Sequence, residues 1–249
     1  MMLQKGIAYG LLLCLSFGGA YSAGGGPELE HIRVDVRDQA ALQRGAAMYM
    51  NYCSGCHSLK YMRYNRMAKD MGLTHFTGEL DTELLVNNLI FTDAKPHAPI
   101  EISMPAESAR QWFGVVPPDL SLSAREKGVS WIYSYLKGFY ADESRPFGSN
   151  NVFVPGVAMP NVLAPLSGRV IDTSDGHPSL DSLLLVQKGT MSEHRFDSAL
   201  QDLVTFLAYV GEPAQLSRYR IGAGVMVFLL VFLLLSWQLK KLYWRQIKK

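Results

Sequence analysis

The sequence predicts a mainly α-helical domain with long loop insertions, followed by a single C-terminal transmembrane helix. Two segments, 39–52 and 198–210, carry apolar residues at helical spacing. Much of the chain between them is rich in proline, glycine and asparagine, as loops are. An uncharged run from Ile221 to Trp237 lies near the carboxyl end, and with its flanks it matches the ~30 Å hydrocarbon core of a bilayer.

The first predicted helix, residues 39–52, has Asp38 as its N-cap. One face combines residues at i, i+3, i+4 and i+7, namely Leu42, Gly45, Ala46 and Tyr49. A glycine inside a helix costs ~1 kcal/mol relative to alanine. We therefore expect another helix to cross closely at Gly45.

The expected partner is the helix over residues 198–210. It can turn inward Leu200, Leu203, Val204, Leu207 and Val210, or the aromatic residues Phe206 and Tyr209. Gly211 ends the helix and Pro213 follows it. The two ends of the domain should thus meet in one helix pair.

Directly after the first helix comes the sequence Cys53-Ser54-Gly55-Cys56-His57. Two cysteines two residues apart can each add to a vinyl group of haem, and the adjacent histidine can then bind the iron as proximal ligand. A redox cysteine pair or half of a zinc site are the alternatives. The zinc alternative is weakened because the chain has no second CxxC and no HxxxH to complete a tetrahedral shell. The motif therefore predicts one covalently attached haem c, in a cytochrome c-type haem domain.

Residues 1–23 have the three regions of a secretory signal peptide. Lys5 is followed by an apolar run from Ile7 to Phe17 and then by small residues, with cleavage expected near Ser22 or Ala23. The third cysteine, Cys14, would be removed with this segment. Covalent haem attachment in bacteria takes place outside the cytoplasm, so the prediction of an exported haem domain, residues 24–217, is consistent with the motif.

Residues 218–249 are expected to form a transmembrane anchor with a basic cytoplasmic tail. Five basic residues follow the apolar run directly: Lys240, Lys241, Arg245, Lys248 and Lys249. Trp237, Tyr243 and Trp244 are placed as interfacial anchors. A buried core helix is the alternative, but such a helix is rarely apolar on every side and then followed by a basic tail.

Charge is distributed unevenly along the chain. The whole sequence has 24 Lys and Arg against 22 Asp and Glu, a formal net charge of +2. Lys5 and the seven basic residues from Arg218 onward lie outside the segment 24–217, which keeps 16 basic against all 22 acidic residues and so carries about −6. An acidic exported domain argues against nucleic acid as a partner and favours a basic soluble protein, although charge spread for solubility gives the same count.

The middle of the domain contains one further clear helix, over residues 130–140. It would present Trp131, Tyr135 and Leu136 as one wall of the haem site. Residues 58–72 are expected to form a partly exposed helix and residues 72–110 connecting structure. Residues 141–170, rich in proline, glycine and asparagine, are expected to form a loop.

The sixth iron ligand decides between an electron carrier and an open site for small molecules. Two methionines precede a proline that would fix the backbone, Met104 and Met159. Spacing alone does not choose between them, and it leaves open a second histidine ligand from among His75, His97, His177 and His194.

Several segments together resemble the cytochrome c1 family of ubiquinol–cytochrome c oxidoreductase, complex III. They are CSGCHSLKYMRYNRM, WFGVVPPDLSLSAR, the aromatic helix ending in YLKGFY, VPGVAMPNVL, and DLVTFLAYVGEP followed by one C-terminal span. They occur in the family's order and cover nearly the whole mature chain.

The resemblance implies further haem contacts. The family's axial methionine corresponds to Met159, so the metal ligands would be His57 and Met159, with Met104 in ordinary packing. Its Pro-Pro-Asp-Leu segment corresponds to Pro117 and Pro118, where we expect a prolyl carbonyl to accept the Nδ1 proton of His57. The family's basic residue that pairs with a haem propionate falls at Arg125 or Lys127, and an additional disulfide of some relatives is absent.

The resemblance also implies an electron carrier that accepts from the Rieske iron–sulfur protein and donates to a cytochrome c, with cytochrome b in the same complex. The carrier would lie in the bacterial inner membrane with its haem domain in the periplasm. It would be a subunit of the oxidoreductase rather than an enzyme on its own, without catalytic residues. The alternatives are a membrane-anchored c-type carrier of another respiratory chain, and a haem peroxidase or gas sensor with an open distal site.

Overall fold

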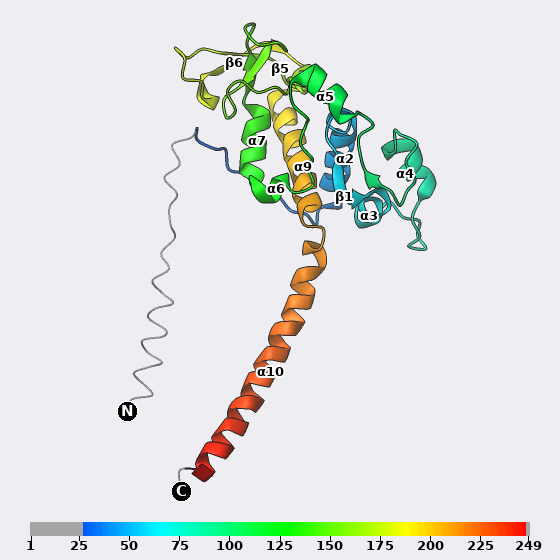
Figure 1. Ribbon diagram of the computed structural model, residues 1–249, viewed down its shortest axis with the longest axis vertical. Coiled ribbons are helices and arrows are strands. Elements are labelled where there is room, and N and C mark those ends of the chain that lie inside the picture. The colour runs from blue at the N-terminus through cyan, green and yellow to red at the C-terminus, as the bar shows by residue number, and fades with distance from the viewer. Residues whose placement is uncertain (1–26, 248–249) are drawn as a thin grey trace.

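The computed structural model describes residues 27–247, so the predicted signal peptide lies outside the described residues. Figure 1 shows a helical domain from which one long helix projects. The helices are α2 (Gln39–Tyr52), α3 (Tyr64–Asp70), α4 (Thr82–Leu89), α5 (Ala106–Phe113), α6 (Ser123–Glu126), α7 (Val129–Lys137), α8 (Ala164–Ser167), η1 (Leu180–Ser182), α9 (Glu193–Gly211) and α10 (Gln215–Ile247). The strands are β1 (Leu59–Arg63), β2 (Pro99–Ile100), β3 (Phe139–Ala141), β4 (Ser149–Asn151), β5 (Gly168–Asp172) and β6 (Leu183–Lys188). The mainly α class predicted from the sequence is confirmed.

Helices α2 and α9 form the centre of the domain, side by side in Figure 1. Asp38 caps α2 as predicted, its carboxylate accepting the Ala41 N–H at 3.0 Å. A Cβ added to Gly45 would lie 2.1 Å from the Asp202 carbonyl oxygen of α9 and 2.7 Å from Phe206 Cβ. The predicted close crossing at Gly45 is confirmed, although α9 begins at Glu193, five residues before the expected start.

The core around this helix pair contains both the aliphatic and the aromatic α9 residues that the sequence offered as alternatives. Leu200, Leu203, Val204, Phe206, Leu207, Tyr209 and Val210 are all buried. The aromatic rings of Tyr49 and Phe206 pack with their centroids 5.7 Å apart. An α9 buried on so much of its surface is enclosed by several elements, and it contacts α6 and α7 as well as α2.

Helix α10 leaves the domain, and its large apolar side chains from Ile221 to Leu239 are exposed. The most apolar 18 consecutive residues within Ser217–Arg245 have a mean hydropathy of 2.2, and none of them is buried in the domain. Within residues 27–247 it is the one helix long and apolar enough to cross a membrane. This is the predicted transmembrane helix, and the absence of any buried residue in its apolar stretch excludes the alternative of a buried core helix.

Two segments between the haem motif and residue 110 differ from expectation. Residues 59–63 form strand β1, not the first turns of a helix, and α3 begins only at Tyr64. The reason is the antiparallel pairing of β1 with β2, forty residues further along the chain. The interpretation of residues 72–110 as connecting structure was wrong, because it contains α4 and α5 as well as β2.

The region after α7 also holds more structure than expected. The helix predicted over 130–140 spans Val129–Lys137, and Phe139–Ala141 instead form β3, which pairs with β4. The predicted loop 141–170 therefore contains β4, α8 and the start of β5. Strands β5 and β6 make a hairpin at the end of the domain opposite α10 (Figure 1).

Candidate functional site

The Cys53–His57 motif forms a turn at the carboxyl end of α2. Cys53 is the C-cap residue, and its carbonyl accepts the N–H groups of Cys56 at 3.0 Å and His57 at 2.9 Å. Ser54 continues the helix contacts through a 2.7 Å bond from its hydroxyl to the Met50 carbonyl. Both cysteines are free thiols and half-buried. Burial raises the pKa of Cys53 to about 12, so this thiol stays protonated at neutral pH.

The imidazole of His57 has one nitrogen occupied. Its Nδ1 lies 2.7 Å from the carbonyl oxygen of Pro118. A carbonyl can only accept, so Nδ1 carries the proton and Nε2 keeps a free lone pair. Burial lowers the pKa of His57, although the bond to Pro118 opposes this effect. The neutral, fixed ring is the form in which a histidine binds iron.

The segment that carries Pro118 is held against strand β1. The Asp119 carboxylate accepts the N–H groups of Lys60 and Ser121, each at 2.9 Å, and the Leu120 N–H donates to the Ser58 carbonyl at 2.9 Å. These bonds begin one residue after Pro118 and therefore fix its carbonyl beside the imidazole. The prolyl carbonyl expected at His57 is that of Pro118, with Pro117 preceding it as a half-buried residue.

Helix α7 supplies an aromatic pair beside Met159. The rings of Trp131 and Tyr135 are stacked, with centroids 5.1 Å apart and planes 7° apart. The Tyr135 hydroxyl lies 3.4 Å from the Met159 sulfur. Leu136, also expected to line the haem, packs partly buried against the core. The structure thus brings three of the predicted site residues, Trp131, Tyr135 and Met159, together.

The two candidates for a propionate partner differ in their contacts. Lys127 pairs with Glu126 at 2.9 Å, and its ammonium lies 5.9 Å from the centre of the Trp131 ring. Arg125 is exposed, and within residues 27–247 no carboxylate pairs with it. The positive charge of Arg125 is therefore available to an outside anion.

The other ligand candidates lie in more open or different surroundings. His75, His97, His177 and His194 are all exposed. Met104 is half-buried on a segment that approaches the motif, where the Ile102 N–H donates to the Ser58 hydroxyl at 3.0 Å. In the described part of the chain no three His, Cys, Asp or Glu side chains gather as a metal cluster, as a zinc site would require.

These residues fit a c-type haem by the chemistry of their donors. The turn presents two unpaired thiols for the vinyl groups, and the adjacent imidazole has its Nε2 free for iron. The half-buried Met159 thioether, beside the Tyr135 hydroxyl, offers a soft second ligand, and the stacked Trp131 and Tyr135 rings offer an apolar surface. The donor set is the one that electron-carrying haem proteins use.

The polar residues that hold the Met159 segment were not predicted from the sequence. Strand β4, Ser149–Asn151, bonds through its side chains to the backbone between Phe153 and Asn161. The residues Ser149-Asn150-Asn151 precede VFVPGVAMP directly, but a polar cluster beside proline and glycine indicates only a loop.

Known proteins resemble the chain over most of its length. A model of the cytochrome C1 family matches residues 32–247. The cytochrome c1 of Allochromatium vinosum is 48% identical over 91% of this chain and 92% of its own. The ammonia monooxygenase gamma subunit of Nitrosomonas europaea is 39% identical over 92% of each chain. The mitochondrial cytochrome c1 of Saccharomyces cerevisiae is 29% identical over 85% of this chain and 68% of its own.

Proposed function

The chain belongs to the cytochrome c1 family, and from this premise we propose that it is the electron-transfer subunit of a ubiquinol–cytochrome c oxidoreductase. It carries one haem c, bound covalently through Cys53 and Cys56. The observation that carries the proposal is the 2.7 Å contact between His57 Nδ1 and the Pro118 carbonyl, which leaves Nε2 as an iron ligand beside two free thiols.

The surroundings of Met159 and Arg125 support a role for each, and the other site residues keep the roles that the family resemblance implies. Met159 is the sixth ligand, because this half-buried residue holds its sulfur 3.4 Å from the Tyr135 hydroxyl of α7. Arg125 pairs with a haem propionate, because its charge is available whereas Lys127 is already paired with Glu126. Trp131, Tyr135 and Leu136 wall the haem, and Pro117 and Pro118 lie along it.

The residues prepare the site for a one-electron change. Haem, when bound, supplies a reversible change of iron between its ferrous and ferric states. The Pro118 carbonyl keeps the His57 tautomer and orientation fixed and raises the basicity of the imidazole. The stacked Trp131 and Tyr135 rings would give the Met159 side of the haem an apolar wall. A site already fixed in this way needs little rearrangement when its charge changes.

The partners follow from the family and the charge. The protein accepts an electron from a Rieske iron–sulfur protein, passes it to a cytochrome c, and assembles with cytochrome b. The net charge of about −6 over residues 24–217 suits a basic acceptor.

The location follows from the two chain ends. Residues 1–23 direct export, and residues 218–249 anchor the protein in the bacterial inner membrane, with the haem domain, residues 24–217, in the periplasm. The basic tail then places the carboxyl end in the cytoplasm. The exposure of α10 supports this arrangement.

The proposal is tested by purifying the full chain from membranes through a C-terminal tag. A haem stain that survives denaturing electrophoresis at the mass of this chain is expected, together with co-purifying cytochrome b and Rieske protein. A c-type carrier that purifies without these two proteins belongs to another respiratory chain. Reduced protein that binds carbon monoxide at neutral pH has an open distal site, and that result rejects an electron carrier in favour of a peroxidase or sensor.

A further inference from the structure

The segment that carries Met159 has little regular structure of its own. Before Met159 it contains one turn, in which the Val157 N–H donates to the Val154 carbonyl at 3.1 Å, and a second turn leads into α8. Val152 and Leu163 are buried at its two ends, whereas Pro155 and Gly156 between them are exposed. Because no residue between these two ends is buried, the middle of the loop needs another source of order to present one side chain in a fixed place.

Strand β4 supplies that order through its side chains. We propose that Asn151 and Asn150 are positioning residues for the Met159 thioether, an inference that rests on the proposed role of Met159 as iron ligand. They act on the loop backbone, which in turn places the sulfur beside Tyr135.

Asn151 connects the start of the loop to helix α7. Its side chain is fully buried, with 0% of its surface exposed. The side-chain oxygen accepts the N–H groups of Phe153 at 2.8 Å and Val154 at 3.3 Å, while the side-chain nitrogen donates to the Tyr135 carbonyl at 2.8 Å. Tyr135 is also the residue whose hydroxyl reaches the Met159 sulfur. One amide therefore ties the loop to the residue that its methionine must meet.

Asn150 acts three residues before Met159, at Gly156. Its side-chain oxygen accepts the Gly156 N–H at 2.8 Å, and its side-chain nitrogen is anchored on the Asp142 carboxylate at 2.9 Å. The Arg145 guanidinium donates to the Gly156 carbonyl at 2.7 Å. Both polar groups of Gly156 are thus held, and its φ of +78° is one that glycine adopts without strain.

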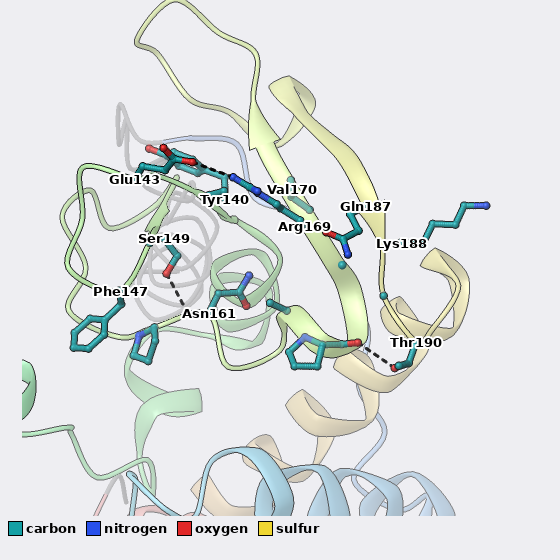
Figure 2. A pocket seen from close by; sticks show the side chains of 17 residues that line it. Tyr140, Glu143, Phe147, Ser149, Asn161, Arg169, Val170, Gln187, Lys188 and Thr190 are labelled. Atoms are coloured by element: carbon teal, nitrogen blue, oxygen red, sulfur yellow. Dashed lines mark hydrogen bonds and ion pairs between the residues drawn. The ribbon is translucent and has the colours of Figure 1, made fainter.

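Ser149 acts on the other side of Met159. Its buried hydroxyl accepts the Asn161 N–H at 3.2 Å, as Figure 2 shows on the wall of a cavity of about 710 Å³. Consecutive residues of one strand therefore hold the backbone before and after Met159. The strand itself is fixed to α7 through its pairing with β3, which begins two residues after that helix ends.

A positioning role for Asn150 and Asn151 predicts a different result on mutation from a role in stability alone. Residues that only stabilise the domain lower its unfolding temperature when they are removed, but the folded protein keeps its haem ligands. Residues that position Met159 change ligation in the folded protein, because the loop gains conformations in which the sulfur is away from the iron.

The test compares Asn150→Ala and Asn151→Ala in the full chain, in detergent. Asn88→Ala is the control, because it also removes an amide bond to a backbone carbonyl, that of Leu84 in α4. Three quantities are measured on folded protein: the weak long-wavelength absorption of ferric haem with a methionine ligand, the reduction potential, and the fraction of reduced haem that binds carbon monoxide.

We expect both β4 variants to keep covalent haem, to lose much of the long-wavelength absorption, to have a lower potential and to bind carbon monoxide about tenfold more than the wild type. Tenfold corresponds to the loss of one or two hydrogen bonds of ordinary strength. Asn88→Ala should match the wild type in all three measurements. Wild-type ligation and potential in both β4 variants would overturn the inference and leave the proposed function intact.

A wild-type protein that itself lacks the methionine absorption overturns the proposed ligand, so the two failures are distinguishable. If Asn151→Ala yields no folded protein, Asn150→Ala decides the question, because its side chain is only half-buried and its loss exposes fewer unsatisfied groups.

Discussion

The hydroxyl of Tyr135 lies 3.4 Å from the sulfur of Met159, with the tyrosine ring stacked on Trp131. The hydroxyl can donate and the thioether can only accept, so the contact draws electron density from the sulfur. A sulfur that donates less electron density to the iron favours the ferrous state over the ferric state. The contact therefore raises the reduction potential of any iron that Met159 binds.

Tyr135→Phe keeps the ring and its stacking on Trp131 but removes the donor. The reduction potential should fall by roughly 20–60 mV, the equivalent of one hydrogen bond. A redox titration measures the change. Tyr133→Phe on the same helix is the control, because the Tyr133 ring lies beside the Lys137 ammonium instead. Equal potentials for the wild type and Tyr135→Phe would contradict the role of the hydroxyl.

Met159→Leu keeps the volume of the side chain and removes its sulfur. Folding and attachment through Cys53 and Cys56 should survive, while the potential falls substantially, since axial ligation is among the levers that move haem potentials over ~0.8 V. Met104→Leu should change neither the potential nor the long-wavelength absorption of the ferric protein. The opposite pattern, with absorption lost in Met104→Leu alone, would assign the ligand to Met104.

Gly45→Ala should destabilise the domain although alanine favours helices. The new Cβ would lie 2.1 Å from the Asp202 carbonyl oxygen, so α2 and α9 would have to separate. We expect a loss of more than ~3 kcal/mol in the free energy of unfolding, measured with denaturant on the full chain in detergent. Ala47→Gly, at an exposed position of the same helix, should cost only ~1 kcal/mol. Similar losses in the two variants would mean that the crossing is not tight.

Electron transfer to a basic cytochrome c should slow as salt rises. The charge of about −6 on residues 24–217 attracts a basic partner. Salt weakens this attraction, because the Debye length falls from ~10 Å at 0.1 M to ~3 Å at 1 M salt. Stopped-flow kinetics over this range measure the effect. A rate indifferent to salt would show that the acidic charge serves solubility alone, or that the acceptor is already held at the membrane.

The parts of the fold that sequence predicted are those with local signals. Asp38 indicates where α2 begins, because an N-cap acts within its own helix. Gly45 indicates where α9 crosses α2, because the crossing depends on close contact at that one residue. Strand β1 was missed because its partner β2 has two residues and lies far along the chain. Helix α4 has a capping residue, Asp81, but at eight residues it is too short to show a period.

In the candidate site, too, residues that are adjacent in sequence could be predicted, whereas contacts between distant residues could not. The motif residues Cys53, Cys56 and His57 are adjacent in sequence and could be predicted from their chemistry. The contact of His57 with the Pro118 carbonyl spans 61 residues and was expected only from the resemblance. Asn151 could not be predicted, because a buried asparagine in a polar stretch is explained by bonds to distant backbone groups that only the fold assembles.

Helix α9 ends at Gly211 and α10 begins at Gln215, which leaves three residues between the domain and its anchor. Even fully extended they would span only ~10 Å. Here they are folded back, with the Glu212 N–H bonded to the Tyr209 carbonyl, the Gln215 N–H to the Glu212 carbonyl, and Arg218 paired with Glu212. The linker is therefore too short and too tightly bonded to let the domain move between two sites relative to its anchor. If the donor and the acceptor lie farther apart than this three-residue linker can reach, the redox protein that delivers or collects the electron must itself move.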